Sequence, residues 1–189
     1  MKKRLFISVA LVLILTLLAP ATVLAAKPVP FNATGEITSI TDGTVKPAGD
    51  SGRWIVVERK ISGKVTISDI TSPFTLDFDV NYTGNVAIYT QAGNIHGRIT
   101  TGSYVFNMNA KSQPLVLVGS LTLPGIGEVP VYKLTITGHW SIIQGAHGEG
   151  DLSASVCFIP TPDGHVGQIV DSAWGFEDST FNLTGQWQP

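Results

Sequence analysis

Strict alternation of apolar and polar residues is the feature that most limits how this chain can fold. It is clearest between residues 74 and 82, where every second residue is apolar and the residues between them are Thr, Asp, Asp and Asn. Successive side chains of an extended strand point to opposite faces, so this pattern predicts a strand with one buried and one wet face. The same period recurs at 104–109, 132–142, 151–158 and 181–187. Because no segment beyond residue 25 keeps helical spacing for three turns, we predict an all-β fold.

Turn-forming residues divide the chain beyond residue 25 into about eight to ten short runs, as in β-barrels and β-sandwiches. Two alternating regions, 53–67 and 131–143, exceed ten residues, and long strands joined by tight turns favour closure into a barrel. The segment 123–130 has two Pro and two Gly and is interpreted as a long loop. We predict one domain, residues 26–189, forming a single antiparallel β-barrel of about eight strands. A β-sandwich is the alternative.

The first 25 residues are typical of a secretory signal peptide. Residues 2–4 are basic, residues 5–19 are apolar, and Val23 and Ala25 are small residues suited to a signal-peptidase site. The apolar run is shorter than the roughly 20 residues that span a bilayer. We therefore predict an N-terminal signal helix cleaved near Ala25, a secreted or extracytoplasmic location, and no membrane contact after cleavage. An uncleaved N-terminal anchor is the alternative.

Charge and cysteine content exclude several classes of protein. Beyond residue 25 the chain has nine Lys and Arg against 14 Asp and Glu, a formal charge of −5. Such a chain lacks the basic surface that nucleic-acid binding requires. The single cysteine, Cys157, excludes an internal disulfide and a multi-cysteine metal centre. We predict no nucleic-acid partner, no cofactor and no metal, and leave the oligomeric state open. Glycosylation sequons, whose use is also open, begin at Asn32, Asn81 and Asn182.

One segment resembles a known protein family. It reads Lys133-Leu-Thr-Ile-Thr-Gly138, then Trp140, then Gln144-Gly-Ala-His-Gly-Glu-Gly150-Asp-Leu152. This is similar to the hairpin of allene oxide cyclase and dirigent proteins, where a strand ending near Thr-Gly is followed by an aromatic residue and a Gly-Ala-x-Gly turn. The resemblance is confined to about residues 132–159 and implies an eight-stranded antiparallel barrel with an apolar lumen. Gly138-His139 replaces the family's usual Gly-Gly, and its catalytic residues match no position here, so no activity is implied.

The same segment predicts a β-hairpin with residues 144–148 as its loop. That loop would place Trp140 opposite Leu152 and Ser141 opposite Asp151. Both pairs keep their faces, the first inward and the second outward, which supports the hairpin.

The leading functional hypothesis is a binding module whose lumen accepts a small apolar ligand. An eight-stranded barrel either fills its interior or leaves room for one small ligand. Arg59 shares the inward parity of its strand and is a candidate for holding a ligand carboxylate, because a buried Arg must be paired or bind an anion. A bulge near Gly63, or a place at the barrel mouth, is the favoured alternative for Arg59. The aromatic residues predicted to bind the ligand are Phe78, Tyr82, Tyr104, Phe106, Trp140 and Phe158.

Two other classes stay open. A cyclase or isomerase could act by confining a reactive apolar substrate, and an ionisable residue deep in the lumen would favour it. A structural or adhesive surface domain would have a solid core and an exposed apolar patch.

Some outward side chains could bind a metal, but we interpret them as a solvated rim because their spacing fixes no ligand geometry. They are His139, His147, Glu149 and Asp151. Asp77 and Asp79 are interpreted as surface carboxylates rather than a glycosidase pair.

Overall fold

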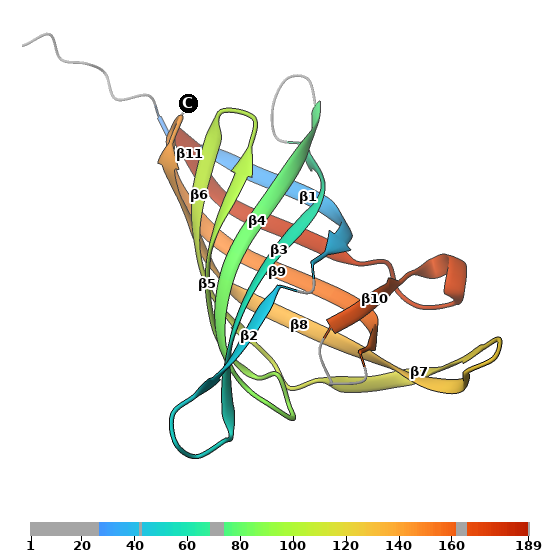
Figure 1. Cartoon of the computed structure of the whole chain (residues 1–189). Helices are drawn as coiled ribbons and strands as arrows, with labels where there is room; N and C mark the ends of the chain where they lie inside the picture. Colours follow the sequence, from blue (N-terminus) through green and yellow to red (C-terminus); the bar gives the residue numbers. More distant parts are fainter. Residues whose placement is uncertain (1–26, 42, 69–73, 162–165, 189) are drawn as a thin grey trace, which may run out of the picture.

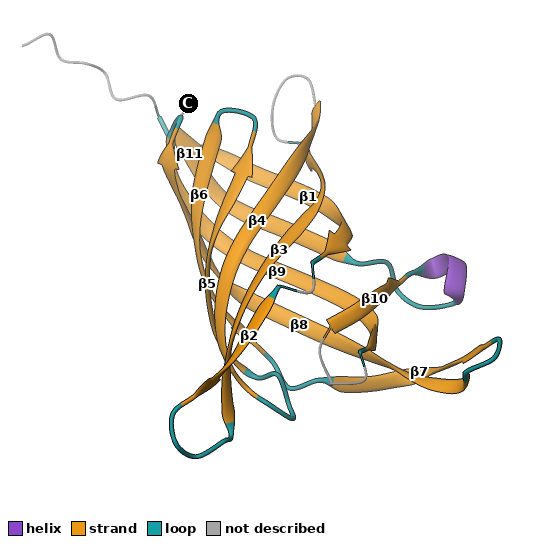
Figure 2. Cartoon of the chain, in the orientation of Figure 1, coloured by secondary structure: helices purple, strands orange, loops and turns teal. Residues whose placement is uncertain are grey.

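The computed structural model describes residues 27–41, 43–68, 74–161 and 166–188, and the structural statements below concern these residues. The segment of the predicted signal helix lies outside them. The all-β prediction is confirmed (Figure 2). The strands are β1 (Val29–Ile40), β2 (Thr44–Ala48), β3 (Trp54–Ile67), β4 (Phe74–Ala87), β5 (Gly93–Thr101), β6 (Tyr104–Ser112), β7 (Val116–Leu123), β8 (Gly127–Gln144), β9 (His147–Pro160), β10 (Val166–Val170) and β11 (Thr180–Gln188), with one short 3-10 turn, η1 (Ser172–Trp174). None of the residues described forms a helix long and apolar enough to cross a membrane.

Eight of these strands form a ring. Their order is β1, β3, β4, β5, β6, β8, β9 and β11, and β11 pairs with β1 to complete the circle. Every pairing is antiparallel, and strands adjacent in the ring are close in sequence except where β1 meets β11 (Figure 1). Ring closure gives these strands partners on both sides, which removes exposed edges over most of their length.

The other three strands extend single members of the ring. β2 pairs with the start of β3, β7 with the start of β8, and β10 with the end of β9. The β7–β8 hairpin and the β10–η1 segment project beyond the ring in Figure 1. Between them lies a small second core of Val131, Cys157 and Val170, covered by Leu121, Ile159 and Phe176.

The predicted long loop at 123–130 is wrong. β7 ends at Leu123 and β8 begins at Gly127, so only residues 124–126 connect the two strands. Pro130 lies within β8 opposite Ser120 of β7, whereas the pairing of β8 with β9 starts only at Tyr132. Proline has no N–H to donate to a ladder, so it fits best where a strand has a partner on one side only. This part of β8 is such a place, because only β7 pairs with it.

The predicted β8–β9 hairpin is confirmed, but its register is shifted by two residues. Trp140 lies opposite Gly150 and Ser141 opposite Glu149, and this last pair ends the β8–β9 ladder. Beyond it, the end of β8 pairs only with β6 and the start of β9 only with β11. The strands are connected through Gly145 and Ala146, and Gly145 has a φ of +96°. A shift of two preserves the side-chain faces, so the inward and outward assignments hold.

Large side chains inside the ring are matched by glycines on neighbouring strands. Phe78 lies directly opposite Gly63, and Trp140 directly opposite Gly150. A Cβ atom added at Gly185 would come within 2.9 Å of the Trp140 indole. The absent side chains therefore provide the volume that the aromatic rings fill, which packs the interior closely.

Candidate functional site

The side chains predicted to bind a lumenal ligand lie inside the ring. Phe78, Phe106, Trp140 and Phe158 are buried in the main core, and Tyr82 and Tyr104 are partly buried against it. The rings contact one another: the Trp140 centroid is 5.1 Å from that of Phe31 and 5.6 Å from that of Phe106. Mutual contacts of this kind are those of a core, and they occupy the faces that a ligand would use.

An enclosed cavity inside the ring has a volume of about 20 Å³ and is lined by apolar side chains, including Ile61 and Ile95, together with Tyr82. This is room for about one water molecule. A ligand in the lumen stays a prediction, and it would require core side chains to move.

Arg59 keeps the inward position that its parity predicts. The favoured alternative was a bulge near Gly63 or a place at the barrel mouth from which the head reaches water. A bulge does lie opposite Gly63, but it is in β1, between Ile37 and Ser39. The pairing of β3 with β4 runs through Gly63 without a shift, so the parity of Arg59 is unchanged. Arg59 is 5% exposed, and its Nε atom has no hydrogen-bond partner among the residues described. A buried charge has therefore been built into the interior, which is costly unless it is compensated.

Tyr82 lies directly opposite Arg59 in the β3–β4 ladder. Burial raises the pKa of the Tyr82 hydroxyl above its ordinary value, while the charge and hydrogen bond of Arg59 oppose the rise. Because the folded-state pKa is the higher one, the protonated hydroxyl stabilises the fold. This contribution is complete below about pH 10 and is lost as the pH rises through the folded-state pKa.

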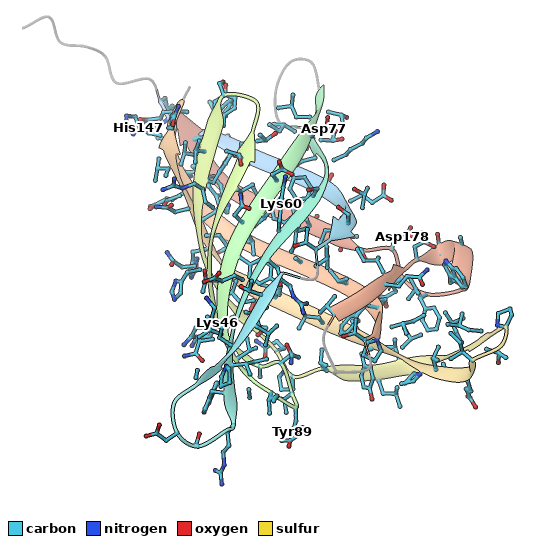
Figure 3. All side chains as sticks on the ribbon, in the orientation of Figure 1. Lys46, Lys60, Asp77, Tyr89, His147 and Asp178 are labelled. Atoms are coloured by element: carbon cyan, nitrogen blue, oxygen red, sulfur yellow. The ribbon has the colours of Figure 1, made fainter. Side chains whose placement is uncertain are left out.

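We expect Tyr82→Phe to lower the free energy of unfolding at pH 7 by about 1 kcal/mol, because Arg59 loses a hydrogen-bonding partner. The variant should also lose less stability than the parent between pH 9 and pH 11. Urea unfolding at both pH values measures the two effects. The control is Tyr89→Phe, since Tyr89 is 89% exposed and points away from the ring at its lower tip (Figure 3). Equal pH dependence in parent and Tyr82→Phe would contradict the assignment.

The outer surface of the ring carries a hollow of about 710 Å³. We call it the outer hollow. It crosses five adjacent strands, β5, β6, β8, β9 and β11. Ala110, Gly138 and Leu152 contribute to its lining between two rows of polar side chains. The rows follow the ladder: one is His96, Asn109, His139, Asp151 and Thr184, and the other is Asn94, Lys111, Thr137, Ser153 and Asn182.

Two hydrogen bonds order the first row. His96 Nδ1 lies 2.7 Å from Asn109 Oδ1, and His139 Nδ1 lies 2.8 Å from Asp151 Oδ1. Since both acceptors are oxygens without hydrogens, each imidazole donates through Nδ1. When the imidazoles are neutral, their Nε2 atoms remain as hydrogen-bond acceptors on the outer face of the sheet, where the hollow lies.

Short side chains make up six of the ten positions in the two rows of the outer hollow, namely Asn94, Asn109, Thr137, Ser153, Asn182 and Thr184. The outer face of β3 and β4 has two further hollows, of about 620 and 370 Å³. Their linings carry more charged side chains, including Glu58, Lys60, Lys64, Asp77 and Asp79. Lys60 and Asp79 form an ion pair of 2.9 Å there.

The alternative chemistries considered for surface carboxylates gain no support. Asp79 accepts a hydrogen bond from Ser62 and pairs with Lys60, and these contacts lower the pKa of its carboxyl. A glycosidase acid needs the opposite shift. Of the rim residues, His139 and Asp151 contact each other, whereas His147 lies opposite Gln188 at the end of the ring (Figure 3). Among the residues described, no three His, Cys, Asp or Glu are grouped as metal ligands.

The sequence places His139 and Asp151 in one polar patch, but most of the outer hollow could not be predicted from it. The other residues of the hollow lie on strands that are far apart in the sequence. They come together only through the register of the pairings and the closure of the ring. The signal that could have found them is compositional: outward positions from residue 94 onward are repeatedly Asn, Ser, Thr or His.

The chain matches no protein-family model, and comparison with curated proteins and with solved structures gives no match either. The similarity of residues 132–159 to the hairpin of allene oxide cyclase and dirigent proteins therefore stays a prediction.

Proposed function

We propose that this chain is an exported binding module in which a β-barrel with a packed core presents the outer hollow as its recognition surface. The observation that carries the proposal is the contrast between the two sides of the sheet. The interior cavity measures about 20 Å³, whereas the outer hollow measures about 710 Å³, within the range of small-molecule sites.

The proposal belongs to the class of surface or adhesive domains with a solid core. A domain of that class would also have exposed apolar surface. Val116, Leu117 and Ile126 of the β7–β8 hairpin are 58%, 60% and 72% exposed, so this hairpin is a second surface through which such a domain could make contacts.

A ligand or substrate confined inside the ring is the second candidate function. It is favoured by the buried Arg59 beside Tyr82, because an ionisable group in a dry interior is what a cyclase or isomerase would use. The interior volume opposes it, since a substrate much larger than water would displace core side chains.

Crystallographic soaking with a library of small polar and apolar fragments would separate the two candidates. We expect polar fragments to gather between the two rows of the outer hollow and no fragment to enter the ring. Apolar fragments seen beside Tyr82 and Ile95, with the outer hollow empty, would contradict the proposal and favour the interior.

A further inference from the structure

We propose that the outer hollow binds an uncharged, polyhydroxylated ligand with the chemistry of an oligosaccharide. This inference rests on the proposed function, because it names the ligand class of the same site.

The charge of the hollow favours a neutral ligand. Its lining holds one ammonium group, on Lys111, and one carboxylate, on Asp151, so the two formal charges cancel when the imidazoles are neutral. The carboxylate is already engaged by His139 at 2.8 Å. An anion would meet a single lysine and a cation a single occupied carboxylate, whereas specific recognition of charged groups uses several convergent counter-charges or a bidentate fork.

The hydrogen-bonding groups suit hydroxyls in particular. The hydrogen bonds made by Nδ1 leave the Nε2 atoms of His96 and His139 as acceptors, and they leave the amide NH₂ of Asn109 as a donor. Asn94 and Asn182 add groups that both donate and accept, and Ser153 adds a hydroxyl. A ligand hydroxyl donates one hydrogen bond and accepts others, so it can use an imidazole nitrogen and a neighbouring amide together.

The shape of the hollow favours an elongated ligand. Five strands at the usual spacing extend over about 19 Å, and the polar rows run across the strands along this direction. Between the polar rows lie Ala110, Gly138 and Leu152. Ala110 and Leu152 turn their side chains into the core, so only backbone forms the floor of the hollow there and no large side chain divides the two rows. A chain of sugar rings carries hydroxyls along both edges, which matches two polar rows that run side by side across the strands.

The test is amide-detected NMR of the full protein titrated with three neutral tetrasaccharides, maltotetraose, cellotetraose and chitotetraose, and with two charged probes, tetragalacturonate and tetralysine. We expect at least one neutral tetrasaccharide to shift the amides of β6, β8 and β9 that flank the hollow. Asn109→Ala and His139→Ala should each weaken that binding about threefold to tenfold, the worth of one hydrogen bond. Thr75→Ala, an exposed position outside the hollow, should leave it unchanged.

The outcomes distinguish the ligand class from the site. If only a charged probe shifts the hollow amides, the neutral ligand class is wrong and the proposed recognition surface stands. If a tetrasaccharide binds elsewhere and is insensitive to Asn109→Ala and His139→Ala, both are wrong. If no neutral tetrasaccharide shifts the hollow amides at millimolar concentration, the inference is overturned. Amide dispersion in each variant's own spectrum shows whether it is folded.

Discussion

Replacing Trp140 by alanine is expected to lower the free energy of unfolding by about 3–5 kcal/mol. Trp140 is 2% exposed, contacts Phe31 and Phe106, and donates a hydrogen bond of 3.2 Å from its indole to the Thr184 carbonyl. Its loss leaves a void that the surrounding rings cannot fill without strain, because the neighbouring positions are Gly150 and Gly185. Urea unfolding followed by circular dichroism measures the change.

The same variant tests whether the interior of the parent is filled. Added indole should raise the melting temperature of Trp140→Ala by occupying the new cavity and should leave that of the parent unchanged. The control is Trp174→Ala, because Trp174 is 44% exposed in η1; we expect a loss below about 1 kcal/mol there. A loss that small at Trp140, or stabilisation of the parent by indole, would be inconsistent with a packed core.

The second large effect is expected from Gly150→Ala. A Cβ atom at Gly150 would lie 1.9 Å from the Thr184 carbonyl oxygen and 2.6 Å from the Gly185 Cα atom. Both contacts are with backbone, so β9 and β11 must separate locally, at the position where Gly150 pairs with Gly185. We expect a loss of about 3 kcal/mol, the upper part of the range for overpacking.

Gly84→Ala is the matched control for this substitution. A Cβ atom at Gly84 would meet its nearest neighbour at 3.5 Å, an ordinary contact. We expect no destabilisation there, and a gain of up to about 1 kcal/mol from the reduced freedom of the unfolded chain. Equal effects at Gly84 and Gly150, measured as urea midpoints, would show that the close approach of β9 and β11 does not limit stability.

Local pattern was sufficient to predict the strands and their faces. The alternation from Phe74 to Tyr82 predicts the buried and exposed sides of β4, and the parity of Arg59 predicts its inward position. Each conclusion depends only on the period of an extended chain. The number of ring strands was likewise near the prediction, because turn residues mark strand ends.

What could not be predicted depends on contacts between distant segments. The composition of 123–130 predicts a loop, because Pro130 suits a strand only when one side of β8 lacks a partner there. The hairpin register could not be chosen from the apolar pattern, because two registers that differ by two residues satisfy that pattern equally. The outer hollow requires His96, His139 and Thr184 to lie in one row, which depends on the β5–β6, β6–β8, β8–β9 and β9–β11 pairings.

The central claim is that recognition occurs on the outer hollow and not inside the ring. NMR of one sample carrying labelled amides and isoleucine methyls tests it most directly, with a neutral tetrasaccharide and an apolar probe, N-phenyl-1-naphthylamine, added in turn. We predict that the tetrasaccharide shifts amides around Asn109 and His139, and that neither compound shifts the methyls of Ile61 and Ile95, which line the interior cavity. Saturable shifts of those methyls with the apolar probe, and none at the hollow, would contradict the account.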